Sequence, residues 1–107
     1  LENIDKFIDN KRELASIYRE FFNKLDIKFV TESKNSRSNY WLNSIILKNK
    51  KDRDKFLNFT NNSGVMTRPI WRLLSSLDMY KNCQTDNLKN SKWLEDRVVN
   101  IPSSVRV

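Results

Sequence analysis

The stretch Asn39–Leu47, NYWLNSIIL, lies near the middle of this 107-residue chain and decides the predicted fold. It is rich in aromatic and β-branched residues, which favour a central β-strand. The segment Asp26–Thr31 alternates polar and apolar residues, as a half-buried strand does. Residues 33–38 between the two segments are polar and predict a loop. The sequence therefore predicts two strands joined by a short connection.

Amphipathic helices are predicted on both sides of these strands. Residues 2–25 place apolar side chains three and four positions apart, with Lys11 as the one interruption. This apolar stripe consists of Ile4, Phe7, Ile8, Leu14, Tyr18, Phe21, Phe22 and Leu25. Residues 49–63 predict a second helix. It is expected to end at Gly64, the only glycine, in a left-handed C-cap.

The last third of the chain is expected to be extended and then helical. Residues 65–71 are predicted to be extended, because Pro69 disfavours helical dihedral angles at the residue before it. Asp86 is expected to cap a final helix over residues 87–98. That helix would bury Leu88, Trp93, Leu94 and Val98. The order helix, strand, strand, helix, strand, helix predicts a single α+β domain. In it, helices pack on one face of a small antiparallel or mixed sheet.

The composition excludes several kinds of site. The chain carries 20 Lys and Arg against 13 Asp and Glu, a formal net charge of +7, and has no His, so imidazole catalysis is excluded. A single cysteine, Cys83, excludes an intrachain disulfide and a multi-cysteine zinc site. One Gly leaves no material for a glycine-rich phosphate loop. No apolar run approaches the roughly 20 residues that span a bilayer.

A basic stretch is the first candidate for function. It follows Tyr40 and Trp41 and consists of Lys48, Lys50, Lys51, Arg53 and Lys55. Cations next to aromatic rings are typical of proteins that bind single-stranded nucleic acid. The alternative is a solvated turn and first helical turn. Asp52 and Asp54, which are interspersed among the cations, weaken the positive field.

The segment Thr67–Arg72, TRPIWR, is the second candidate. Its two guanidinium groups could bind phosphate or carboxylate oxygens in a bidentate manner, and Trp71 could stack on a ring. In the alternative, Ile70 and Trp71 belong to the core and the arginines point to water, and spacing alone favours this alternative. Neither Cys83 nor any carboxylate pair predicts a nucleophile or an acid–base couple.

Several segments in a fixed order carry a family resemblance. They are Asn39–Leu47, Gly64–Trp71, Leu77–Cys83, Asn87–Leu88, Trp93–Leu94 and Asn100–Ser104, preceded by a long helix with Asn10, Lys11 and Arg12. Together they resemble the C-terminal region of pyridoxal-phosphate-dependent nucleotide-sugar aminotransferases of the DegT/StrS type. The resemblance is strongest to the subgroup that aminates 4-keto-6-deoxy-N-acetylhexosamine nucleotides on the way to bacillosamine- and legionaminic-type sugars.

The resemblance implies a domain that lacks its catalytic partner. In this family, a large domain supplies the Schiff-base lysine and most of the pyridoxal phosphate site, and none of the matched positions here is that lysine. Residues 1–107 therefore look like the small C-terminal domain of a fold-type I aminotransferase, without the large cofactor-binding domain. No catalytic residue and no metal site are expected, and the chain is predicted to be inactive alone. Leu1 in place of an initiator Met fits a processed chain or a piece of a longer one.

Five residues are implied to bind substrate. Arg68 would hold a phosphate, carboxylate or sugar oxygen, and Trp71 would form a wall of the pocket. Asn39, Tyr40 and Trp41 match a segment that lies near cofactor and substrate in the family, although Tyr40 and Trp41 could equally be core residues. Asn100–Ser104 matches the end segment of the family, for which a structural role is expected.

The resemblance also implies the reaction and its partners. The whole enzyme would move an amino group from glutamate to a nucleotide-linked 4-keto-6-deoxy sugar. It would act as a cytoplasmic homodimer with no nucleic-acid or membrane partner. The alternative from another class is a stand-alone basic module that binds single-stranded nucleic acid.

Overall fold

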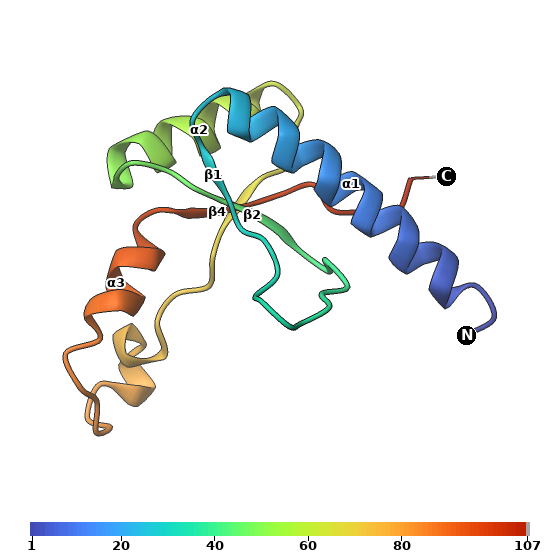
Figure 1. The fold of residues 1–107 in the computed structure, drawn as a ribbon. Helices are drawn as coiled ribbons and strands as arrows, with labels where there is room; N and C mark the ends of the chain where they lie inside the picture. Colours follow the sequence, from blue (N-terminus) through green and yellow to red (C-terminus); the bar gives the residue numbers. More distant parts are fainter. Residues whose placement is uncertain (107) are drawn as a thin grey trace.

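A four-stranded antiparallel sheet lies at the centre of the computed structural model, which describes residues 1–106 (Figure 1). Its strands follow the order β1-β2-β4-β3 and all neighbours are antiparallel. They span Lys28–Phe29 (β1), Asn43–Ile46 (β2), Arg68–Pro69 (β3) and Val98–Ile101 (β4). The helices are α1 (Ile4–Lys24), α2 (Lys50–Asn62) and α3 (Lys89–Glu95), with two 3₁₀ turns, η1 (Leu74–Ser76) and η2 (Asp78–Tyr80). The predicted α+β class is confirmed, with an antiparallel sheet rather than a mixed one.

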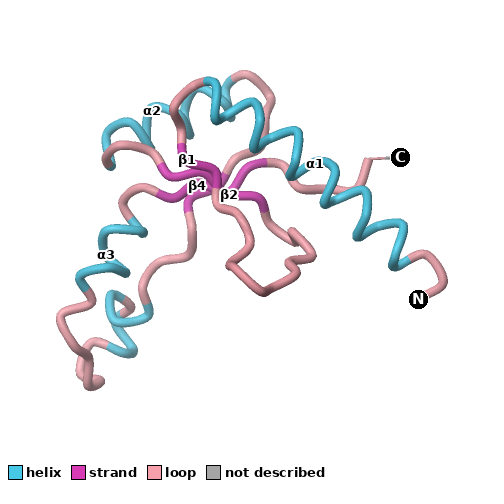
Figure 2. The backbone as a smooth tube through the Cα atoms, viewed as in Figure 1, coloured by secondary structure: helices cyan, strands magenta, loops and turns pink. Residues whose placement is uncertain are grey.

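The core lies on one face of the sheet. Ile45 of β2 and Val99 of β4 are paired across the ladder, and both are fully buried. Helix α1 covers this face with Ala15 and Phe22, and α2 adds Phe56 and Leu57 at the edge of the same cluster. Figures 1 and 2 show α1 and α2 on the same side of the strands, whereas α3 and the 3₁₀ turns form an arm that extends away from them. Burial of alternate residues in the strands therefore holds two of the three described helices against one face.

The end of α2 has the predicted glycine cap. Gly64 adopts φ 81°, a left-handed conformation that glycine reaches without strain. Its N–H donates to Asn61 O (3.1 Å), and Val65 N–H donates to Thr60 O (2.8 Å). These two bonds form a Schellman motif and satisfy carbonyls that the helix leaves free. The beginning of α2 is capped by Asn49, whose side chain accepts a hydrogen bond from Asp52 N–H.

The predicted strand over residues 39–47 is too long at its start. Strand β2 begins at Asn43, and residues 39–42 form a turn without strand pairing. Asn39 Oδ1 accepts a hydrogen bond from Trp41 N–H at 3.0 Å, and Tyr40 adopts φ 46°. An asparagine side chain that binds the backbone two residues ahead favours a turn. This local bond outweighs the β-propensity of the two aromatic residues.

The predicted helix over residues 87–98 is wrong at both ends. Asp86 does not cap it: its side chain accepts from Leu88 N–H (2.7 Å), and Leu88 itself is the N-cap, with φ 50°. Helix α3 ends at Glu95, and Val98–Ile101 forms β4, the strand that pairs with both β2 and β3. Of the residues expected to be buried by the helix, Trp93 remains 47% exposed. Pairing in the sheet buries Val98 and Val99 more completely than a continued helix on the arm would.

The apolar stripe of α1 is only partly covered. Phe22 is buried, whereas Phe7 and Phe21 remain about half exposed at 49% and 55%. Ile4 and Leu25 at the two ends of the stripe are exposed to a similar degree. The helix thus carries more apolar surface than the described sheet can bury.

Candidate functional site

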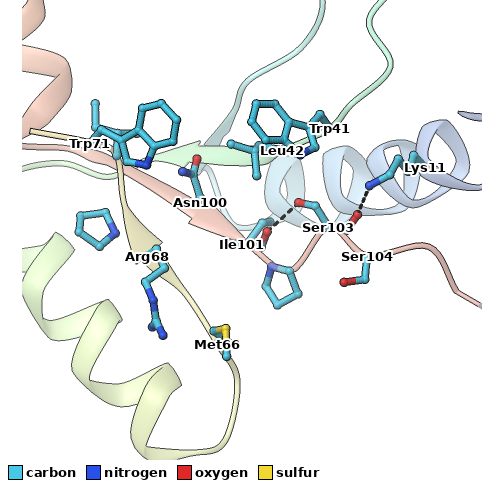
Figure 3. A pocket seen from close by; sticks show the side chains of 13 residues that line it. Lys11, Trp41, Leu42, Met66, Arg68, Trp71, Asn100, Ile101, Ser103 and Ser104 are labelled. Atoms are coloured by element: carbon cyan, nitrogen blue, oxygen red, sulfur yellow. Dashed lines mark hydrogen bonds between the residues drawn. The ribbon is translucent and has the colours of Figure 1, made fainter.

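An open cavity of ≈ 690 Å³ lies where β3 and the end of β4 meet the turn before β2 (Figure 3). Its wall combines aromatic and aliphatic side chains with two cations. The lining residues are Lys11, Trp41, Leu42, Met66, Arg68, Pro69, Ile70, Trp71, Asn100, Ile101, Pro102, Ser103 and Ser104. Segments from four separate parts of the chain therefore meet at this cavity.

Two exposed tryptophans form part of the wall. Trp71 is 85% exposed and Trp41 is 64% exposed, so neither belongs to the core. Figure 3 shows them on the same side of the cavity, with Asn100 between Trp71 and Leu42. The core alternative for Trp71 is thereby excluded. Exposed indoles above a concave surface offer flat faces on which a ring of a ligand could stack.

Arg68 is held by the last turn of α2. Its Nη1 donates to Asn61 Oδ1 (3.0 Å) and to the backbone carbonyl of Thr67 (2.8 Å). Thr67 is itself buried, and its hydroxyl lies 2.6 Å from the hydroxyl of Thr60. In the described part of the chain, Nε and Nη2 of Arg68 make no hydrogen bond. The guanidinium is therefore fixed at one nitrogen and offers its remaining donors to a ligand.

Lys11 and Ser103 form the opposite end of the cavity. Lys11 Nζ donates to the carbonyl of Ser103 at 2.5 Å, and the Ser103 hydroxyl donates to Ile101 O at 2.8 Å (Figure 3). The same hydroxyl accepts the N–H of the buried Asn43 at 2.8 Å. Sequence reasoning did not identify Lys11 as a site residue. Its position as the one charge in the apolar stripe of α1 was the available signal.

Three of the five predicted site residues meet at this cavity. Arg68, Trp71 and Trp41 line it, whereas Tyr40 lines a smaller cavity of ≈ 150 Å³ beside Arg12 and Glu32. Asn39 lines neither of these two cavities, and its side chain holds the turn described above. Ser103, expected to have a structural role, has that role and also lines the larger cavity.

The basic stretch does not join this site. Lys48, Lys50 and Lys51 are exposed at the far end of β2, whereas Trp41 precedes that strand. Arg53 pairs with Asp54 at 2.8 Å and donates to Glu95 O at 2.6 Å. The aromatic and basic groups predicted to interleave are therefore separated by the length of β2.

Neither a metal-binding cluster nor a membrane-spanning helix is found in residues 1–106. These residues contain no group of three or more His, Cys, Asp or Glu side chains placed to hold a metal ion. None of their helices combines the length and hydrophobicity needed to cross a lipid bilayer.

The whole chain matches one family model. Residues 1–107 match the model described as the DegT/DnrJ/EryC1/StrS aminotransferase family. The chain is 34% identical over 106 residues to a GDP-perosamine synthase of Vibrio cholerae, in a match that covers 96% of this chain and 29% of that protein. It is 31% identical over 106 residues to a GDP-perosamine synthase of Escherichia coli O157:H7, which covers 96% of this chain and 28% of that protein.

A solved structure shares the fold. The crystal structure of the sugar aminotransferase CalS13 from Micromonospora echinospora superposes with a TM-score of 0.85 and 21% sequence identity. The match covers 100% of this chain and 28% of that one. The chain thus spans less than a third of the length of these three proteins.

Proposed function

Because the chain belongs to the DegT/DnrJ/EryC1/StrS aminotransferase family, we propose that it is the substrate-covering C-terminal part of a pyridoxal-phosphate-dependent sugar aminotransferase. The whole protein would transfer an amino group from glutamate to a nucleotide-linked 4-keto-6-deoxy sugar. Residues 1–107 would be its small domain. A separate large domain would hold the cofactor.

The described residues do not fit the cofactor itself. A Schiff-base lysine must be buried with its amine free to attack a carbonyl. Every lysine in residues 1–106 is exposed except Lys11, which is half-buried and donates to the Ser103 carbonyl. We therefore assign no step of the cofactor chemistry to these residues.

The cavity with Arg68 and two exposed tryptophans is the observation that carries the proposal. A nucleotide sugar combines flat and apolar ring faces with a diphosphate. Trp71 and Trp41 offer the faces, and the free nitrogens of Arg68 offer donors matched to phosphate oxygens. Asn61 holds Arg68 before the ligand arrives, so less side-chain entropy is lost on binding. These residues would bind and orient the sugar nucleotide rather than react with it.

The finer assignment rests on the sequence motifs. We propose the subgroup that leads to bacillosamine- and legionaminic-type sugars. Two relatives of this chain are GDP-perosamine synthases, which supports an amino-sugar product but leaves the nucleotide open. The whole protein is further proposed to be a cytoplasmic homodimer without nucleic-acid or membrane partners.

Arg68→Ala in the whole protein tests this function. Loss of a charge-assisted hydrogen bond costs about 1.5–3 kcal/mol, so kcat/KM for the nucleotide keto-sugar should fall by roughly 10-fold to 150-fold. The KM for the amino donor should stay unchanged, because Arg68 would contact the sugar nucleotide alone.

A matched control is Arg72→Ala. Arg72 belongs to the same segment and is exposed, but it does not line the cavity, so this variant should keep wild-type kinetics. Equal kinetics of Arg68→Ala and Arg72→Ala would contradict the proposed role. An absence of any transamination by the wild-type whole protein would contradict the reaction itself.

A further inference from the structure

The ion pair between Arg12 and Glu32 joins α1 to the chain that leads into β2. Arg12 Nη1 lies 2.9 Å from Glu32 Oε2, and Arg12 Nη2 lies 3.0 Å from Glu32 Oε1. Two parallel bonds between a planar guanidinium and a carboxylate fix both distance and orientation. The side chains are 30% and 26% exposed, so water has only partial access to the pair. This geometry differs from a mobile surface ion pair.

Both members of the pair also hold the backbone of Ser38. Arg12 Nη1 donates to Ser38 O at 2.7 Å, and Ser38 N–H donates to Glu32 Oε2 at 2.6 Å. Tyr40 contacts both members of the pair. Its hydroxyl accepts a hydrogen bond from Glu32 N–H at 3.2 Å, and the centre of its ring lies 5.7 Å from the Arg12 guanidinium carbon. We call these four residues, Arg12, Glu32, Ser38 and Tyr40, the clamp.

Trp41 follows directly after the clamp. On its other side, Asn43 N–H donates to Ser103 Oγ, and Asn43 begins β2. Trp41 as a residue is 64% exposed, so packing does little to hold its side chain. Tyr40 keeps a left-handed φ of 46°, which residues other than glycine adopt rarely and retain where surrounding contacts hold them. The position of Trp41 at the cavity thus depends on how its backbone is anchored.

We propose that the Arg12–Glu32 ion pair is a positioning device for Trp41, which it keeps at the wall of the large cavity. Arg12 and Glu32 do not line that cavity, so they act through the 38–42 segment. The consequence for catalysis rests on the proposed function, in which Trp41 contacts the sugar nucleotide. The positioning itself does not depend on that function.

Fluorine NMR tests the positioning directly. The whole protein is labelled with 5-fluorotryptophan, and the Trp41 resonance is assigned by its loss in Trp41→Phe. In Glu32→Gln, this resonance should move towards the position of the unfolded protein and become narrower, whereas the Trp71 and Trp93 resonances should stay in place. Glu13→Gln is the matched control, because it removes the Arg106–Glu13 pair from the same helix without touching the clamp.

Steady-state kinetics test the consequence of this positioning for substrate binding. The KM for the nucleotide keto-sugar should rise about threefold to tenfold in Glu32→Gln, with kcat within about twofold of wild type. The same substitution should have no further effect in a Trp41→Ala background, because the two residues act on one contact. Arg12→Lys keeps the charge but loses the two-pronged geometry, and it should raise KM by an intermediate factor. It serves as the second variant if Glu32→Gln does not fold.

The outcomes separate the two proposals. If the wild-type protein does not aminate a nucleotide keto-sugar, the proposed function fails, and the fluorine resonance alone still decides the positioning. An unchanged Trp41 resonance in folded Glu32→Gln or Arg12→Lys would overturn the positioning role. Additive effects of Glu32→Gln and Trp41→Ala on KM would overturn the route through Trp41.

Discussion

Glu32 is the residue whose ionisation the fold changes most clearly among those described. Its pKa is lowered from 4.5 to about 2, chiefly by the side-chain hydrogen bond from Arg12 and then by the N–H of Ser38. A carboxyl whose pKa is lower in the folded state binds its proton more weakly there than in the unfolded chain. The stabilisation it provides is therefore complete above the unfolded value near 4.5, and it is lost as the pH falls towards 2.

We expect the Glu32 carboxyl to titrate with a midpoint near 2 in a carbon-detected NMR titration of the folded protein. Arg12→Met should raise this midpoint towards the ordinary value, because it removes the largest cause of the shift. Arg53→Met, which removes an arginine that pairs with Asp54 instead, should leave the midpoint in place. A wild-type midpoint near 4.5 would show that the ion pair does not form in solution.

At this scale, the sequence predicts single residues better than pairs. Arg68 was identified through the family resemblance of its segment, whereas Lys11, the one charge within the apolar stripe of the first helix, was not identified as a site residue. The Arg12–Glu32 pair was not visible, because 20 residues separate its members and only the packing of β1 against α1 brings them together. Contacts between distant residues follow from tertiary structure, which local patterns do not specify.

The helices and strands also differ in how far the sequence alone predicts them. The end of α2 could be predicted because Gly64 is the only residue that reaches a left-handed φ at no cost. Strand β4 could not be predicted, because Val98 continues the helical spacing of Trp93 and Leu94. What decides its conformation is its place between β2 and β3. The cavity also depends on sheet pairing: the resemblance identified Arg68 and Trp71, and the β3–β4 pairing brings Asn100 beside them.

Ile45→Ala tests how much the buried pairing of β2 with β4 contributes to the stability of the fold. Ile45 is fully buried opposite Val99, so removing its side chain should lower the free energy of unfolding by about 2–5 kcal/mol. Ile45→Val should lower it by about 0.5–1.5 kcal/mol and provides a milder variant if the alanine variant does not fold. Urea denaturation measures the free energy of unfolding of each variant. Phe59→Ala, at a residue that is 72% exposed, should change stability by less than about 0.5 kcal/mol. Similar losses for Ile45→Val and Phe59→Ala would contradict the assigned core.

At the scale of the molecule, the chain exposes more apolar surface than its small core requires. Phe7 and Phe21 on α1, Trp71 at the cavity, and Leu74 and Met79 in the 3₁₀ turns of the arm are all exposed. The relatives it matches are more than three times as long. Both observations support a domain that functions as part of a larger protein. Under the proposed function, binding of the sugar nucleotide and chemistry at the cofactor are divided between two parts of that protein.

This division predicts what the 107-residue chain does alone. After incubation with pyridoxal phosphate and gel filtration, the isolated chain should keep no cofactor absorbance and should not transaminate. Lys11 is the one half-buried lysine among residues 1–106, and its amine already donates to the Ser103 carbonyl. The whole protein, treated in parallel, should keep the absorbance. Exposed lysines can react weakly with any aldehyde, so the decisive control is Lys11→Met. A band that the isolated wild-type chain retains and Lys11→Met loses would place cofactor binding within this domain and contradict the proposed division.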